Sequence, residues 1–276
     1  MTGNSDKPRN KMGMLLKNDF LASSRVISLI YIVEIIAFVF FMIIKDRGNN
    51  RLLALGLILN FAIPFLLVFV SLFFVIYDFN KSLYSQQGYL TYSLPVTAKQ
   101  LLGSKMIVYG LWMFVSYAVA LFVWGYLASY AEGNENVKMA DVALTLFGMP
   151  SIAHIKVYLF YYVIMFFIIT FSFISIIYFA ITASHMRTFQ NANFISAVII
   201  FFICSIIMFA FIAIVDKNIF ISFLVYDDGP TKLVIGKKDL ADGVSLPMSP
   251  IFYLVIQDIA LFFVTSAIMK KRINIK

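Results

Sequence analysis

Six long apolar runs constrain the fold of this sequence more than any other feature. A helix needs about 20 apolar residues to cross the ~30 Å hydrocarbon core of a bilayer. The runs cover residues 26–44, 52–77, 106–131, 157–183, 194–215 and 250–269. None of them alternates apolar and polar residues with the period of a strand. The sequence therefore predicts an all-α integral membrane fold, with a single six-span domain over residues 1–276.

The composition supports the same class. Hydrophobic residues make up 62% of the chain and charged residues only 13%, whereas soluble domains carry about 25% charged residues. A net charge of +8 would suggest nucleic-acid binding in a soluble protein. In a membrane protein its distribution between the two sides matters more, so we expect membrane lipid and no nucleic acid as a partner.

The distribution of charge predicts the orientation of the spans. An even number of spans places both chain ends on one side. That side carries thirteen basic groups, namely Lys7, Arg9, Lys11, Lys17, Arg25, Lys81, Lys99, Lys105, Arg187, Lys270, Lys271, Arg272 and Lys276, against three acidic ones, Asp6, Asp19 and Asp78. The other side balances nine basic against nine acidic groups. By the positive-inside rule both termini are cytoplasmic, and we expect a multi-pass protein of the plasma membrane.

The segment ahead of the first span has two faces. Residues Met12, Leu15, Leu16, Phe20 and Leu21 share one helical face, and Lys11, Lys17, Asn18 and Arg25 lie on the other. This pattern predicts an amphipathic helix over residues 11–25, lying in the membrane interface with its lysines toward anionic headgroups. An ordinary basic anchor for the first span is the alternative.

The connection between spans 2 and 3 is unusually long for a turn. It takes about 27 residues if the second span ends near Tyr77 and the next apolar run resumes after Lys105. Thr97 and Gln100 have the spacing of a capping box, so the third helix should begin at residue 97 and run to 131. Pro95 disfavours helix at the residue before it and separates this helix from residues 81–94. That segment is rich in Tyr and Leu outside the bilayer, which suits docking into a groove of another protein.

A second long connection lies between spans 5 and 6. Its 34 residues mix apolar patches with turn signals such as Asp228-Gly229-Pro230 and Asp242-Gly243. A loop of this length without structure of its own is uncommon. We expect a small folded cap or a re-entrant element at the outer face.

These features together resemble the transmembrane subunit of an ATP-binding-cassette (ABC) exporter of the type-2 class. The resemblance is carried by the amphipathic entry helix, six spans with cytoplasmic ends, the stretch "GYLTYSLPVTAKQLLGSK" and the large outer loop. It implies a coupling helix between spans 2 and 3 that contacts the ATPase. The contact residues would be Tyr84, Gln86, Gln87, Tyr89 and Leu94, with Pro95 at the end of the helix.

The resemblance also implies partners. The chain has no G-x-x-x-x-G-K-[ST] motif, so ATP and Mg²⁺ would bind a separate ATPase subunit, and no cofactor is expected on this chain. Six spans form half of a typical pathway, which implies a dimer with a second copy or a paralogue. The expected substrate is hydrophobic, amphipathic or cationic, of the drug or antimicrobial-peptide class.

Three polar residues inside the spans are candidates for the substrate pathway. Glu34 lies near the centre of span 1 and Asp258 within span 6. Buried carboxylates cost about 2.5–3.5 kcal/mol on insertion scales, so they should face the bundle interior or a cavity. Either they line a path for cationic substrates, or they are protonated and hydrogen-bonded to Asn60, a serine or a tyrosine. Asn60 and Pro64 predict a bend in span 2, because Pro64 leaves the Asn60 carbonyl without its helical donor.

Two other functions remain open. A proton-coupled secondary transporter could use Glu34 or Asp258, although such folds usually consist of repeated halves and no repeat is visible here. An intramembrane enzyme would need a nucleophile with a base, or clustered metal ligands. The sequence has neither G-x-S-x-G nor H-E-x-x-H, and both histidines lie outside the spans. A transport subunit that is not itself an enzyme is the favoured interpretation.

Overall fold

Six helices within the described part of the chain are long and apolar enough to cross a membrane. A computed structural model describes residues 11–47, 49–86, 88, 96–131, 138, 142, 155–186, 193–218, 221–225, 232–235 and 244–273. The helices are α1 (Lys11–Ile44), α2 (Asn50–Tyr84), α4 (Ala98–Ala131), α6 (Ile155–Ser184), α7 (Asn193–Asn218) and α8 (Ser249–Ile273). The protein is therefore a multi-pass, predominantly helical membrane protein, as predicted.

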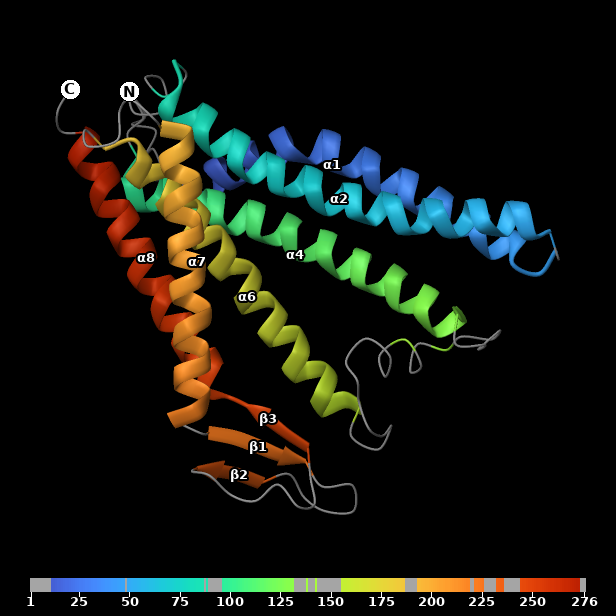
Figure 1. Cartoon of the computed structure of the whole chain (residues 1–276). Helices are drawn as coiled ribbons and strands as arrows, with labels where there is room; N and C mark the ends of the chain where they lie inside the picture. The colour runs from blue at the N-terminus through green and yellow to red at the C-terminus, as the bar shows by residue number, and fades with distance from the viewer. Residues whose placement is uncertain are drawn as a thin grey trace, which may run out of the picture.

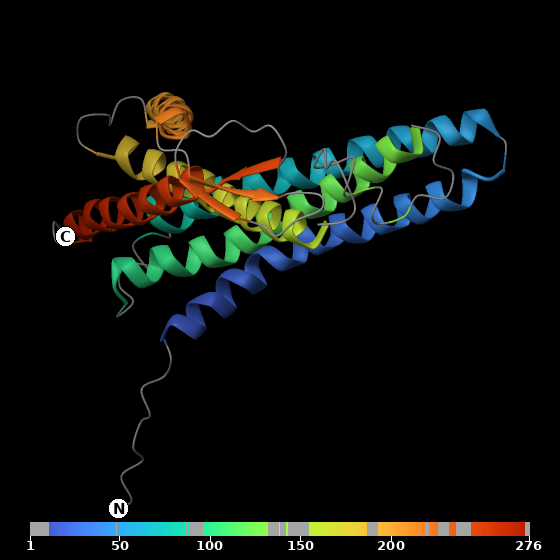
Figure 2. The same ribbon diagram turned by 90° about the horizontal axis from the view of Figure 1, so that it is seen from below.

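The helices form two groups that meet at one end of the molecule. Helices α1, α2 and α4 lie side by side, while α6, α7 and α8 diverge from them (Figure 1). Contacts of α4 with α6 and α8, and of α2 with α6, join the groups. Helix α1 begins and α8 ends at this shared end in both views (Figure 1, Figure 2).

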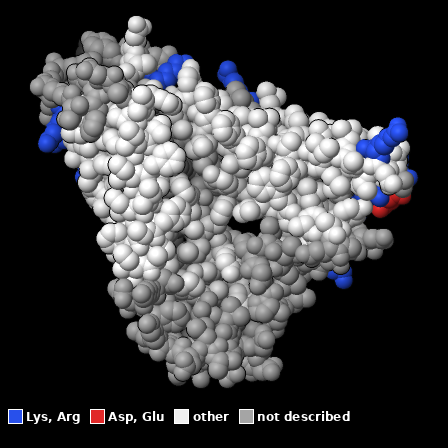
Figure 3. Space-filling view, in the orientation of Figure 1, with Lys and Arg blue, Asp and Glu red and all other residues white. Residues whose placement is uncertain are grey.

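The charged side chains visible on one face lie at the two ends of the apolar surface. In Figure 3, Lys and Arg side chains gather near the shared end and at the tip of the α1–α2 turn, with an uncharged surface between them. Lys45, Asp46 and Arg47 belong to that turn. This separation is what helices that cross a hydrocarbon layer require.

The first helix is longer than the sequence predicts. The interfacial segment 11–25 and span 26–44 were expected as two elements, but α1 runs through both without a break. Within it, Ser23 Oγ donates to the Asp19 carbonyl oxygen at 2.9 Å, so this polar residue makes its hydrogen bond inside the helix. Leu15 packs against the core and Phe20 stacks on Trp112 at 5.2 Å between ring centroids, whereas Leu21 stays half-exposed. The predicted apolar face is thus divided between α4 and the surface.

The second helix also extends beyond its predicted end. It continues from Tyr77 to Tyr84, so the connection to α4 covers residues 85–97 instead of about 27 residues. Val75, Phe79 and Leu83 are buried at a spacing of four residues and join the core. This packing extends the helix through a segment that is polar on its other faces.

The start of α4 follows the prediction from the capping box. The backbone N–H of Thr97 donates to Gln100 Oε1 at 3.0 Å, and the backbone N–H of Gln100 donates to Thr97 Oγ1 at 3.3 Å. Both amides would otherwise lack a helical acceptor. The predicted capping box is confirmed, and Ala98 is the first residue of α4.

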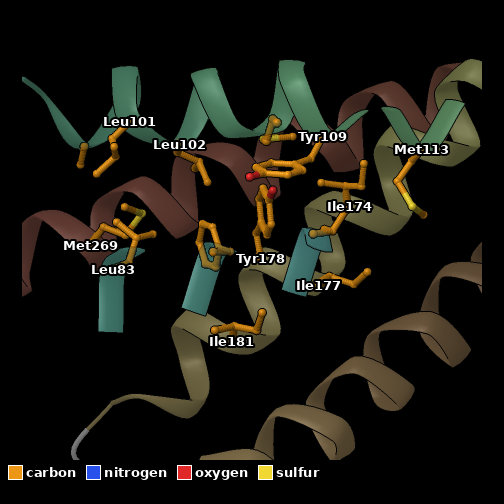
Figure 4. Packing of buried hydrophobic residues seen from close by; sticks show 14 residues of the cluster. Leu83, Leu101, Leu102, Tyr109, Met113, Ile174, Ile177, Tyr178, Ile181 and Met269 are labelled. Carbon is orange, nitrogen blue, oxygen red and sulfur yellow. The ribbon is translucent and has the colours of Figure 1, made fainter. Parts of the chain in front are cut away.

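The largest buried cluster lies where α2, α4, α6 and α8 meet. Tyr109 of α4 and Tyr178 of α6 point toward one another in its centre (Figure 4). Phe79 of α2 stacks on Tyr178, with ring centroids 3.9 Å apart and an interplanar angle of 10°. Met269 of α8 completes the cluster from the fourth helix. This core joins the two helix groups near the shared end.

A small antiparallel sheet stands between α7 and α8, at the end of these helices away from the termini (Figure 1). It consists of β1 (Ile221–Val225), β2 (Lys232–Ile235) and β3 (Val244–Pro247), in the order β2-β1-β3. The residue paired with Phe223 is Leu233 on one side and Leu246 on the other. Tyr161 of α6 donates from its hydroxyl to the Pro247 carbonyl at 2.6 Å. A small folded cap or a re-entrant element was predicted here, without strands, so the predicted all-α class is corrected to a helical fold with a three-stranded sheet.

Two glycines of α4 test how closely the helices pack. A Cβ added at Gly110 would lie 2.7 Å from Phe171 Cζ of α6, whereas at Gly103 the nearest atom would be Met12 Cε at 3.5 Å. Ala is favoured over Gly by about 1 kcal/mol within a helix. Gly103→Ala should therefore raise the thermal unfolding midpoint in detergent, and Gly110→Ala should lower it, because overpacking costs about 1–3 kcal/mol. Equal shifts in both variants would contradict the close α4–α6 contact.

Candidate functional site

Three helices meet at a buried ion-pair cluster at the base of the 85–97 connection. Lys105 of α4 is only 2% exposed, and its Nζ lies 3.3 Å from Asp19 Oδ1 of α1. The same ammonium pairs with Asp78 of α2. Ser104 Oγ donates to Asp19 Oδ2 at 2.9 Å. We call Asp19, Asp78, Ser104 and Lys105 the Lys105 cluster.

The electrostatics of the Lys105 cluster are those of a desolvated site. Burial raises the pKa of the Asp19 carboxyl above its usual value, while Lys105 and Ser104 act in the opposite direction. The Nζ of Lys105 also lies 5.8 Å from the centroid of the Tyr109 ring. A buried ion pair gains little net stability, but removing one partner leaves an uncompensated charge. The cluster therefore fixes the relative positions of α1, α2 and α4 at this end.

Sequence reasoning missed the Lys105 cluster. Lys105 was counted among the basic groups that set the orientation, without a partner. A signal was present, since Asp19 and Asp78 are two of only three acidic residues assigned to the basic side. Both lie on helices that pack against α4. An acidic residue on each neighbouring helix is the pattern that could have indicated the cluster.

The predicted coupling residues are only partly within the described chain. Tyr84 is half-buried and stacks on His185 at the end of α6, with ring centroids 4.1 Å apart. His185 Nδ1 donates to the Ile181 carbonyl at 2.8 Å. Gln86 is exposed. Tyr84 thus contacts its own chain on one side, next to an exposed Gln86. The other predicted contact residues lie outside the described residues, namely Gln87, Tyr89, Leu94 and Pro95.

Glu34 is buried among α1, α2 and α4. It is 2% exposed, and neither of its carboxyl oxygens has a hydrogen-bond partner among the described residues. Asn60, proposed above as a possible partner, donates instead from Nδ2 to the carbonyls of Ala37 and Gly56, both at 2.9 Å. Because α1 and α2 are antiparallel neighbours, the Asn60–Ala37 contact brings Pro64 to the level of Glu34. A buried carboxyl without a protein partner is costly, and a proton, an ordered water or a bound ligand would each lower that cost.

A chain of hydroxyls lies one turn from Glu34, linking the same three helices. Tyr31 of α1 shares a hydrogen bond with Ser116 of α4 at 2.9 Å, and Ser71 of α2 shares another with Ser116 at 2.6 Å. Ser116 Oγ also donates to the Trp112 carbonyl at 2.8 Å. Isolated serines in apolar runs carried no clear signal in the sequence. Together with Glu34 and Asn60 they give the α1–α2–α4 group a polar interior.

Asp258 lies in a different place. It is partly buried on α8, and Ser172 Oγ of α6 donates to Asp258 Oδ2 at 3.0 Å. The other carboxyl oxygen, Asp258 Oδ1, has no hydrogen-bond partner among the described residues. Glu34 and Asp258 belong to different helix groups (Figure 1), so within one chain the two predicted pathway carboxylates do not line a common space. Of the other two candidates, Asn60 shares a helix group with Glu34 and Asp258 does not.

The described residues contain no group of three His, Cys, Asp or Glu side chains placed as metal ligands. His154 lies outside the described residues, and His185 is held by Tyr84 and the Ile181 carbonyl. The site around Glu34 offers a buried carboxyl near the hydroxyls of Tyr31, Ser71 and Ser116, which suits a cation, a proton or a hydrogen-bond donor.

Comparisons with family models, curated proteins and solved structures found no match to this chain.

Proposed function

We propose that this chain is the transmembrane subunit of an ATP-driven exporter of the type-2 ABC class. In this proposal ATP and Mg²⁺ bind a separate ATPase subunit, and a second copy or a paralogue completes the pathway. The six membrane-spanning helices support the proposal. So does the position of the chain ends, because α1 begins and α8 ends at the end where residues 85–97 connect α2 to α4.

One observation carries the proposal: both ends of the 85–97 connection are fixed by buried structure. α2 continues past its apolar run and is anchored by Phe79 and Leu83. α4 begins at a complete capping box, and two turns later Lys105 pairs with α1 and α2. A push on residues 85–97 would therefore move three spans together. This is the mechanical property that a coupling element between an ATPase and a membrane pathway needs.

The proposed substrate follows from the polar interior. The carboxyl of Glu34, which has no hydrogen-bond partner among the described residues, suits a cationic or amphipathic substrate, such as a basic peptide or drug. Asn60 lies in the same helix group, and Asp258 would act from the other group. In a dimer the pathway would run between the two subunits, with the apolar side chains of the spans holding the apolar part of the substrate.

The coupling assignment is tested by co-purification from the native membrane. Tyr89→Ala and Leu94→Asp should each remove a P-loop ATPase, identified by mass spectrometry and by Mg²⁺-dependent ATP hydrolysis, while membrane insertion remains normal. Truncating a hot-spot residue, a class in which Tyr is enriched, costs about 2 kcal/mol or more, so the ATPase yield should fall at least about tenfold. Tyr130→Ala, near the last residue of α4, and Leu52→Asp, near the first residue of α2, are matched controls at the opposite end of these helices and should retain the ATPase. Full retention in both coupling variants would contradict the assignment.

A second candidate, a proton-coupled secondary transporter, is favoured by the same buried Glu34. The two proposals differ in their energy source. Purified chain in liposomes, without an ATPase, should carry no protons under an imposed pH gradient if the export proposal holds. A proton flux that disappears in Glu34→Gln would instead support the secondary transporter.

A further inference from the structure

An apolar groove opens between α2 and α7, with α6 as its floor. Its volume is about 470 Å³. Most of its wall is aliphatic or aromatic, including Leu72 and Ile76 of α2, Ile177 of α6 and Phe201 of α7. The small side chain of Ala197 in α7 also lines the groove, and a larger residue there would fill part of it. The groove lies near the shared end of the molecule, where α2 and α6 end and α7 begins (Figure 1).

One end of the groove is polar and basic. Asn80, Ser184 and His185 line this end, and Asn80 also lines a neighbouring hollow with Lys81 and Gln86. Lys81 is exposed, and its Nζ lies 5.2 Å from the centroid of the Tyr77 ring. Among the described residues that line the two hollows, none is acidic. The polar end therefore offers the ammonium of Lys81 and the side-chain amide of Asn80, while Ser184 and His185 donate to the Ile181 carbonyl.

Helix ends of both polarities lie at this site. The last turns of α2 and α6 repel an anion through their free carbonyls. However, the Lys81 carbonyl accepts from Ser85 Oγ, and the Ile181 carbonyl accepts from His185 Nδ1. Helix α7 begins at Asn193, beside the groove residue Phe194, so its first N–H groups face the same end. Among these helix ends, the first turn of α7 is the one that attracts an anion.

The groove is apolar along the α2 wall and polar at one end, which is the pattern that an amphipathic ligand requires. Leu72 and Asn80 are eight residues apart on α2, about 12 Å along the helix axis at 1.5 Å per residue. The apolar wall thus extends about 12 Å before the polar end begins. The polar end coincides with the end of the apolar run of α2 near Tyr77, at the level where lipid headgroups lie.

We propose that this groove binds one anionic phospholipid, with an acyl chain along the apolar wall and its phosphate between Lys81, Asn80 and the first turn of α7. Basic pockets between spans on the cytoplasmic side are a recurring way to bind anionic headgroups. The charge complementarity favours an anionic lipid over a second copy of the chain, since Lys81 would lose solvent without gaining a partner in an apolar contact. The proposal does not depend on the export function.

Native mass spectrometry of the full chain in detergent tests the proposal. The probes are dioleoylphosphatidylglycerol and dioleoylphosphatidylcholine, which share acyl chains and differ in net charge. One phosphatidylglycerol should bind per chain more tightly than phosphatidylcholine. Lys81→Gln should weaken phosphatidylglycerol binding about fivefold, the usual contribution of one lysine near a lipid surface, and leave phosphatidylcholine unchanged. Lys270→Gln replaces an exposed lysine of α8 outside the groove and should change the binding of neither lipid.

Filling the groove tests the acyl-chain part. Ala197→Trp should lower the affinity for both lipids at least about tenfold. The indole would displace the acyl chain from the groove wall, and a lost apolar contact of this size exceeds about 1.4 kcal/mol. Ala210→Trp, on an exposed part of the same helix, is the matched control and should bind normally. Val198→Trp replaces Ala197→Trp if the latter unfolds.

Equal affinity for the two lipids, or normal lipid binding in the filled variants, would overturn the proposal. Loss of a dimer with normal lipid binding in Ala197→Trp would assign the groove to a second copy instead.

Discussion

Lys105→Met is expected to lower the free energy of unfolding by about 3–5 kcal/mol, the usual result of breaking a buried ion pair by removing one partner. The ammonium is 2% exposed and contacts Asp19 and Asp78, which are themselves only 16% and 24% exposed. Without Lys105, two carboxylates from different helices would face each other in a partly desolvated site. The unfolding midpoint of purified protein in detergent measures the loss. A second readout is ATPase co-purification, which should fall because α1, α2 and α4 are no longer held together.

Two controls separate the ion pairs from a general effect of losing a lysine. Lys99→Met removes an exposed lysine of the same helix, whose Nζ lies over the Phe263 ring at 4.7 Å. It should cost no more than about 1 kcal/mol. Replacing Asp19 and Asp78 with Leu together with Lys105→Met removes all three charges, which is often neutral for stability. A loss of the same size in this triple variant as in Lys105→Met would contradict the ion-pair explanation.

The pH dependence of the Lys105→Met variant provides a further check. Burial already raises the pKa of Asp19, and Lys105 counteracts that rise. Removing Lys105 therefore raises the pKa further, so the folded state binds a proton at Asp19 more tightly than the unfolded state does. Stability then increases as the pH falls from neutral toward the ordinary Asp value of 3.8. The difference between variant and wild type should be smaller at about pH 5 than at about pH 7.5.

The apolar runs predicted the spans because burial in lipid requires about 20 apolar residues whatever their neighbours are. The helix ends were less predictable. Residues 78–84 read as polar in sequence, yet Phe79 and Leu83 hold them in α2 through packing on α4 and α6. The capping box at Thr97 was predictable because its hydrogen bonds are local. The strands near 221–247 depend on pairing between segments that are short and separated in sequence, which apolar periodicity alone does not reveal.

The candidate site was also predictable only in part. That Glu34 would face the bundle interior followed from its position in an apolar run. The partner of Asn60 did not follow, because the Asn60 amide can reach the Ala37 carbonyl only where α1 and α2 pack closely. Gly56 permits that approach, since a Cβ there would lie 3.2 Å from Phe41 Cδ2. The Lys105 cluster depends on residues 86 and 27 positions apart. Such pairs are set by the tertiary fold and stay hidden in a single sequence.

Glu34→Gln is expected to reduce export by about 10–100-fold, the effect of losing a contact to a charged group worth about 1.5–3 kcal/mol. Glutamine keeps the shape of the side chain but removes its negative charge. The readout is the resistance to a cationic antimicrobial peptide of cells that carry the chain with its ATPase. Expression and ATPase co-purification should stay near wild type, since Glu34 lies far along α1 from the Lys105 cluster. Asp258→Asn should have a smaller effect, because Asp258 lies in the other helix group.

Leucine at the same position separates a pathway role from a packing role. Glu34 has no hydrogen-bond partner among the described residues, so Glu34→Leu removes a buried polar group without breaking a bond. It should leave stability unchanged or raise it by about 1–3 kcal/mol, while export is lost. Asn60→Leu is the matched comparison on α2. It removes the hydrogen bonds to Ala37 and Gly56 and should lower stability by about 1–3 kcal/mol. Wild-type export in Glu34→Gln, with lower stability in Glu34→Leu, would mean that Glu34 holds the α1–α2–α4 group together and does not contact the substrate.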